Sequence, residues 1–62
     1  MVSQDEIRNE LKNFLKEKGI KNKKVAEKVM LSDQTISMFL HEKRELSHRK
    51  LVLIHLFVME NN

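Results

Sequence analysis

Apolar residues recur at helical spacing in the first third of the chain. They lie at offsets of four, seven and eight residues, which is the pattern of one buried helix face: Ile7, Leu11, Phe14 and Leu15. Ser3 and Glu6 have the S-x-x-E spacing of a capping box. Gly19 suits the left-handed conformation in which many helices end. We therefore expect a helix over about residues 4–18.

The rest of the chain predicts three shorter helices, over about residues 23–29, 33–40 and 48–60. Ser32 and Ser47 are suitable N-caps for the last two, and the charged segment 41–46 between them favours a loop. The inward-facing apolar residues form one expected core: Ile7, Leu11, Phe14, Leu15, Ile20, Val25, Ala26, Val29, Leu31, Ile36, Phe39, Leu46, Leu51, Ile54 and Val58. The expected fold class is all-α, a compact bundle of four short helices in one domain over residues 1–62.

The composition fits a small helical domain without disulfides. The chain has 62 residues, no cysteine, no proline and a single glycine. Chains of this length are often marginally stable, and without cysteines oligomerisation is the common aid that stays open. The first ten residues are too polar for a secretory signal, and the longest apolar run, residues 51–59, is too short to span a bilayer. We expect a cytoplasmic protein that has no membrane partner.

The segment "NKKVAEKVMLSDQTISMFL", residues 22–40, resembles the helix-turn-helix of the Cro/repressor type, also called the Xre family. The resemblance implies a lambda-repressor-like fold and a sequence-specific, DNA-binding transcriptional regulator similar to phage or plasmid repressors. The family usually has glycine at the position of Met30 and often another near Glu42. Either Met30 adopts a left-handed conformation, at a cost on the order of 1 kcal/mol, or the turn geometry differs.

The third helix has an uncharged polar side suited to base edges. With Ile36, Phe39 and Leu40 on the core side, helical rotation puts Gln34, Met38 and His41 on the opposite side, with Ser37 beside them. The first residues of a recognition helix usually contact base edges, which adds Asp33 to the candidates Gln34, Ser37 and Met38. Gln34 can pair bidentately with adenine, Asp33 can accept from cytosine, and a methionine can contact a thymine methyl group. The resemblance implies the same role for Asp33, Gln34 and Met38. The alternative is an ordinary solvated helix face.

Positive charge gathers beside this helix, although the net charge is only +3. Lysines at the start of the second helix oppose its dipole but suit phosphates, which a helix N-terminus also favours. The resemblance adds Thr35 and Asn22 as residues that hold phosphates. The expected phosphate contacts are Lys21, Asn22, Lys23, Lys24, Thr35, His41, Lys43 and Arg44. The alternatives are a solvated lysine run and a loop neutralised by Glu42 and Glu45.

The fourth helix carries more apolar residues than its own domain can cover. The surplus predicts a two-fold dimer interface made of Val52, Leu53, Leu56, Phe57 and Met59. Such a homodimer would place two recognition helices about 34 Å apart on a palindromic operator in double-stranded DNA. One alternative is that these residues cover the first helix together with Met1 and Val2. Another is a protein-interaction module, antitoxin-like or anti-repressor-like, that binds a different protein.

Catalytic and metal-binding patterns have no support in the sequence. His48 and His55 are seven residues apart, too far for joint ligation from one helix, and there is no cysteine to join His41. No nucleophile lies beside a base, and no glycine-rich phosphate loop is present. We expect no enzyme activity, metal, cofactor or small-molecule ligand. The resemblance implies a repressor in a bacterial or phage-infected host cytoplasm that blocks polymerase at an overlapping promoter.

Overall fold

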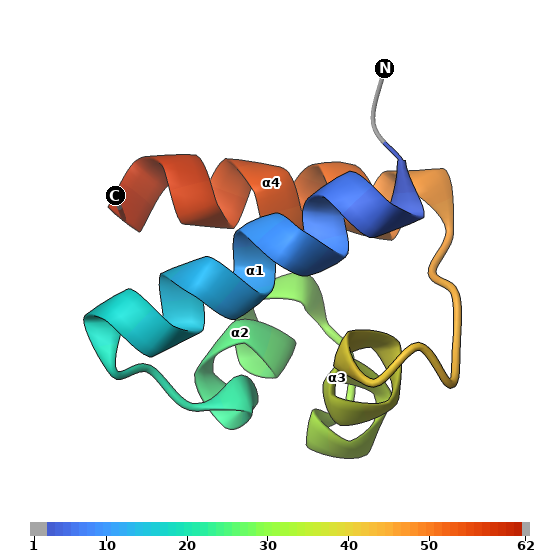
Figure 1. Ribbon diagram of the computed structural model, residues 1–62, viewed down its shortest axis with the longest axis horizontal. Helices are drawn as coiled ribbons and strands as arrows, with labels where there is room; N and C mark the ends of the chain where they lie inside the picture. The colour runs from blue at the N-terminus through green and yellow to red at the C-terminus, as the bar shows by residue number, and fades with distance from the viewer. Residues whose placement is uncertain (1–2, 62) are drawn as a thin grey trace.

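The computed structural model describes residues 3–61, and within them four helices pack in two layers (Figure 1). The helices are α1 (Gln4–Lys18), α2 (Asn22–Val29), α3 (Asp33–Leu40) and α4 (His48–Asn61). α1 and α4 pack together as one layer, and α2 and α3 form the other. The all-α class is confirmed, and each expected helix bound lies within one residue of the observed one.

Serine side chains begin three of the helices, as the sequence predicts. The Ser3 hydroxyl accepts a hydrogen bond from the Glu6 N–H at 3.2 Å, and Ser32 accepts one from Thr35 at 3.1 Å. Ser47 accepts from the Lys50 N–H at 3.4 Å. Each bond satisfies a backbone donor that the first turn of a helix leaves without a partner.

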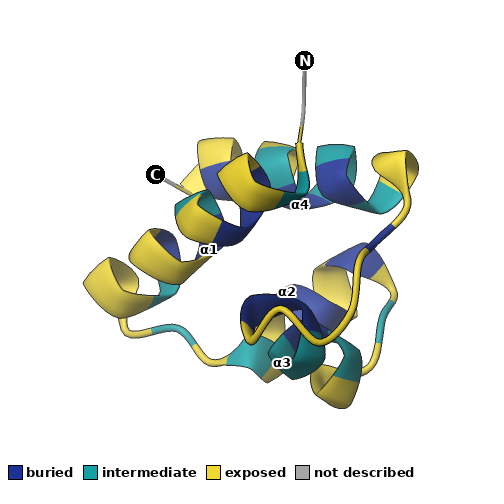
Figure 2. Cartoon of the chain, turned by 45° about the vertical axis from the view of Figure 1, so that its right-hand side comes forward, coloured by how far each residue is buried: buried dark blue, intermediate teal, exposed yellow. Residues whose placement is uncertain are grey.

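The core lies between the two layers (Figure 2). It contains twelve of the fifteen expected residues, together with Leu40 and Phe57, whereas Leu15, Ile20 and Leu31 are only partly buried against it. The buried apolar residues are Ile7, Leu11, Phe14, Val25, Ala26, Val29, Ile36, Phe39, Leu40, Leu46, Leu51, Ile54, Phe57 and Val58.

The prediction that Phe57 of α4 lies in a dimer interface was wrong. We expected it on an exposed side of the helix, but it is only 6% exposed. Its ring packs edge-on against the ring of Phe14 on α1, with the centroids 5.6 Å apart. For this residue the alternative was right, because it covers the first helix. Met1 and Val2, the other part of that alternative, lie outside the described residues.

Two turns adopt the left-handed conformation without glycine. Met30 has φ 59° and ψ 45°, and Glu42 has φ 61°. After α2, the Leu31 N–H donates to the Ala26 carbonyl at 2.9 Å. After α3, Lys43 donates to Met38 at 2.8 Å in the pattern of a Schellman motif. The glycine-type turns are therefore kept, and Met30 and Glu42 bear the strain.

Candidate nucleic-acid interface

The outward side of α3 is built on a buried inner side. Ile36 and Phe39 are 0% exposed and fix the helix against the core. Asp33 and Gln34 are exposed in its first turn, and the expected base-contacting residues Ser37 and Met38 are half-buried. The structure therefore brings the four expected base contacts onto one short helix, with its first turn most accessible to a ligand.

The N-terminus of α3 is held by a pair of hydroxyl groups. The hydroxyl oxygens of Ser32 and Thr35 are 2.7 Å apart, and the Ser32 oxygen also accepts from the Thr35 N–H. Thr35 is half-buried, and its hydroxyl is oriented by the contact with the Ser32 hydroxyl. A hydroxyl can make more than one hydrogen bond, so Thr35 can contact a phosphate while it keeps this contact.

The lysines at the start of α2 are all at the surface. Lys21, Lys23 and Lys24 are exposed, while Asn22 is half-buried. Lys21 occupies the N-cap position of α2 but makes no side-chain capping bond. The Lys24 N–H donates to the Lys21 carbonyl at 3.1 Å. A helix N-terminus without a side-chain cap, next to three cationic side chains, is suited to an anion.

A second basic segment follows α3. Lys43 and Arg44 are exposed in the loop between α3 and α4. Exposed His41 lies at the start of this loop, with its Nδ1 2.8 Å from the Ser37 carbonyl. A carbonyl oxygen only accepts hydrogen bonds, so Nδ1 is the donor and Nε2 is left for other partners. Apart from Thr35, which is in α3, the expected phosphate contacts thus lie on two segments, one at the start of α2 and one after α3.

Two cationic side chains from outside the motif hold the C-terminal ends of its helices. Arg8 of α1 donates from Nε to the Phe39 carbonyl at 2.7 Å, and Lys50 of α4 donates to the Val29 carbonyl at 2.9 Å. Positive charge at a helix C-terminus is stabilising. Neither residue is among those expected from the sequence. For Arg8, the sequence does contain an indication of burial: it lies seven positions before Leu15, at the edge of the apolar face.

Some apolar side chains on the outer side of α4 are left exposed by the rest of the domain. Leu56 is 50% exposed and Met59 is 62% exposed. Val52 lies four residues before Leu56 and is half-buried. The spacing of these three puts them on one side of the helix, and we call them the α4 stripe. Leu53 is packed against the core instead, although it stays partly exposed.

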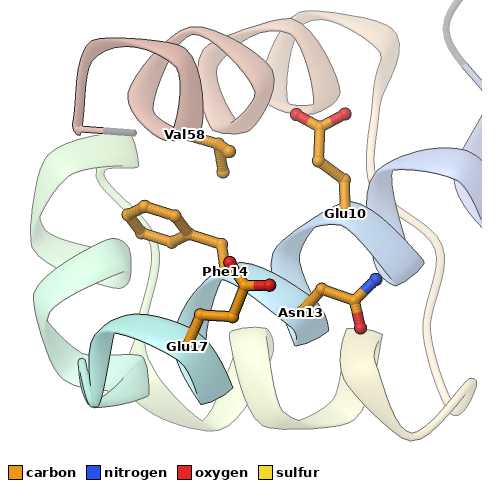
Figure 3. Close-up of a pocket in the computed structure, with 5 residues that line it drawn as sticks. All are labelled: Glu10, Asn13, Phe14, Glu17 and Val58. Atoms are coloured by element: carbon orange, nitrogen blue, oxygen red, sulfur yellow. The ribbon is translucent and has the colours of Figure 1, made fainter.

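A shallow acidic groove separates α4 from the outer side of α1. Figure 3 shows Glu10, Asn13, Phe14 and Glu17 of α1 on one side and Val58 of α4 on the other, around a cavity of about 190 Å³. The Glu10 carboxylate also lies 2.8 Å from Nδ1 of His55. Two carboxylates at its rim repel phosphate. DNA is therefore not expected at this groove.

The comparisons agree with this geometry. A family model for helix-turn-helix proteins matches residues 11–56, which include the whole of α2 and α3. The chain belongs to the helix-turn-helix family of the Cro/Xre type. It is a DNA-binding protein of the transcription-regulator class. Searches of curated proteins and of solved structures gave no match.

Within residues 3–61, no helix has the length and apolar character needed to cross a membrane. No three histidine, cysteine, aspartate or glutamate side chains of this part of the chain gather as a metal-binding group.

Proposed function

We propose that this protein is a dimeric Cro-like repressor whose α3 enters the major groove of a palindromic operator. The observation that carries the proposal is the two-sided character of α3. Its inner residues are fully buried, and Asp33 and Gln34 are presented at its first turn. Residues at the start of a recognition helix are the ones that usually contact base edges. We assign base contacts to Asp33, Gln34, Ser37 and Met38.

The two basic segments anchor the helix on the DNA backbone. We assign phosphate contacts to Lys21, Asn22, Lys23, Lys24, Thr35, His41, Lys43 and Arg44. Contacts to phosphate fix the register and orientation of a protein on the duplex, while contacts to base edges supply specificity. One segment includes the first turn of α2 and the other follows α3, so cations lie at both ends of the motif.

The α4 stripe is the proposed dimer interface. It consists of Val52, Leu56 and Met59, with Leu53 beside it. Phe57, which the sequence placed in this interface, is not part of the proposal because it is buried in its own protomer. Half-site spacing on DNA is about 34 Å. The longest dimension of the described chain is 25 Å. Two copies in contact are therefore large enough to span neighbouring half-sites, with residues 1–62 as one domain and α4 as its dimerisation element.

The proposed repression is steric, and it takes place in a bacterial or phage-infected cytoplasm. A dimer on an operator that overlaps a promoter excludes polymerase, and occupancy then follows the protein concentration. No cofactor or small-molecule effector is part of this proposal.

A second candidate function is a protein-interaction module, antitoxin-like or anti-repressor-like. The observation that favours it is the exposure of Leu56 and Met59, since an exposed apolar patch marks an interface without specifying its partner. In this case α4 binds a different protein, and the charges around α2 need not contact DNA.

A gel-shift experiment at two salt concentrations separates the two functions. The DNA-binding proposal expects retention of random-sequence DNA at low salt, tighter binding to selected DNA, and loss of both as salt rises. The triple variant Lys21→Gln, Lys23→Gln, Lys24→Gln should lose most of the low-salt binding. The double variant Lys12→Gln, Lys16→Gln is the control, because these exposed lysines lie on α1 outside the proposed interface. No retention at low salt would contradict DNA binding.

A further inference from the structure

The loop between α3 and α4 is attached at both ends to side chains of α1. Just before the loop, in the last turn of α3, the Phe39 carbonyl accepts a hydrogen bond from Nε of Arg8 at 2.7 Å. At its end, the Gln4 amide makes two bonds to Leu46: Nε2 donates to the carbonyl at 2.6 Å, and Oε1 accepts from the N–H at 3.0 Å. The residues in between, 41–45, are exposed. The hydrogen bonds at its two ends therefore fix the position of the loop.

The bond from Arg8 to Phe39 is buried, and the two bonds from Gln4 to Leu46 are partly buried. Phe39 and Leu46 are 0% and 8% exposed, and Arg8 is 6% exposed. The Arg8 guanidinium also donates to the Asp5 carboxylate at 2.7 Å and lies 5.0 Å from the centroid of the Phe39 ring. The paired bonds of Gln4 fix the plane of the peptide groups at Leu46, which a single bond would not do. Hydrogen bonds that are wholly or partly removed from water are stronger than exposed ones.

We propose that Gln4 and Arg8 are positioning residues for DNA binding. They lie four positions apart on one side of α1 and hold the loop so that Lys43 and Arg44 reach two phosphates beside the C-terminus of α3. Neither Gln4 nor Arg8 touches DNA in this arrangement. The inference rests on the proposed function, because it takes Lys43 and Arg44 as phosphate contacts.

The physical basis is the order of the loop before DNA arrives. A cation on an unrestrained loop loses conformational freedom when it pairs with a phosphate, which weakens binding. A loop fixed at Phe39 and Leu46 has already lost most of that freedom during folding. Releasing one end leaves the charges of Lys43 and Arg44 unchanged but makes their phosphate contacts less favourable.

A double-mutant cycle tests this link. Gln4→Met keeps the length of the side chain and removes both bonds to Leu46. DNA affinity is measured over a range of salt concentrations for the wild-type protein, Gln4→Met, the pair Lys43→Ala, Arg44→Ala, and all three together. Two lost phosphate contacts flatten the slope of log affinity against log salt by about 1.8. We expect Gln4→Met to flatten the slope by itself, and removal of Lys43 and Arg44 to have a smaller effect in its background.

Arg8→Lys gives the same double-mutant cycle at the other end of the loop. This second cycle tests the inference even if Gln4→Met does not fold. It keeps the positive charge and removes the Nε donor. Phe14→Leu is the control for lost stability, because Phe14 is buried far along α1 from Gln4. All affinities are measured at a temperature at which circular dichroism shows every variant to be folded. The control should leave the salt slope at its wild-type value.

Additive effects would overturn the inference while leaving the proposed function in place. In that outcome Gln4→Met and Arg8→Lys leave the salt slope unchanged, and removing Lys43 and Arg44 has the same effect in every background. Absence of DNA binding by the wild-type protein would instead overturn the proposed function, and the positioning role with it.

Discussion

The Nε of Arg8 donates a hydrogen bond of 2.7 Å to the carbonyl of Phe39, which joins α1 to the last turn of α3. The same carbonyl accepts the Glu42 N–H at 3.2 Å, so one oxygen serves both the left-handed turn and the helix-to-helix contact. Arg8 is also only 6% exposed, and a buried charge is costly without hydrogen-bond partners.

Arg8→Met should therefore lower the free energy of unfolding by about 1.5–3 kcal/mol, the usual range for a hydrogen bond that involves a charged group. Urea denaturation followed by circular dichroism measures the change. Asp5→Asn is the control, since it weakens a bond to a largely exposed carboxylate and keeps the bond to Phe39. Its effect should be less than half as large. Equal effects of the two variants would show that the bond to Phe39 contributes little.

Met30→Gly should stabilise the protein. Met30 has φ 59° and a side chain that is 82% exposed, so the substitution relieves strain and removes few contacts. The left-handed conformation costs a non-glycine residue about 1–2 kcal/mol, part of which the extra freedom of glycine in the unfolded chain offsets. We expect a net gain of about 0.5–1 kcal/mol in thermal or urea unfolding.

Met30→Ala is the matched control, because it removes the same side chain and keeps the strain. It should change stability little. Glu42→Gly should add a similar increment, since Glu42 has φ 61° in a turn away from Met30. A stabilisation by Met30→Ala equal to that by Met30→Gly would assign the effect to the exposed side chain instead of the backbone.

Lys24→Ala should weaken binding to all DNA sequences by a similar factor. Lys24 is exposed at the start of α2, where a phosphate contact is proposed, and phosphate contacts carry no sequence information directly. The slope of log affinity against log salt should become less steep by about 0.9, the value for one phosphate contact. Fluorescence anisotropy with operator and random DNA measures both quantities. A loss confined to one sequence would contradict the phosphate assignment.

Leu56→Glu should convert the proposed dimer to a monomer. Leu56 is 50% exposed in the centre of the α4 stripe, and a charge there cannot be buried in a symmetric interface without a partner. Sedimentation at micromolar concentration measures the mass. Asn9→Glu is the control with the same charge change at an exposed position of α1. A wild-type protein that sediments as a monomer would contradict the proposed dimer.

Helix bounds and most of the core follow from the sequence because they depend on local signals. Ser3, Ser32 and Ser47 begin their helices where expected, and apolar spacing identifies the inner side of α3. Burial of Phe57 could not be predicted in this way, since it depends on where Phe14 of α1 lies beside α4.

The residues that hold the candidate interface in place are even harder to predict from the sequence. The polar side of α3 follows from the helical period once Ile36 is taken as buried. The bonds from Gln4 to Leu46 and from Arg8 to Phe39 join residues 42 and 31 positions apart. No short-range pattern contains such pairs, so the residues that hold the loop became apparent only in the folded chain.

Gln34→Ala addresses the central assignment, that α3 contacts base edges. Gln34 is exposed in the first turn of α3, where its amide can donate and accept together. Its loss should cost roughly 1–3 kcal/mol of discrimination at one base pair of each half-site and relax specificity there. Binding to random DNA should change little, because the phosphate contacts remain.

The most direct test is to select oligonucleotides from a random pool with the wild-type protein and with Gln34→Ala, and to sequence both retained pools. The wild-type pool should contain one short half-site repeated with two-fold symmetry about one helical turn apart. The Gln34→Ala pool should lose preference at one position of that half-site and keep the others. A wild-type pool no different from the input, or two identical enriched pools, would contradict the account.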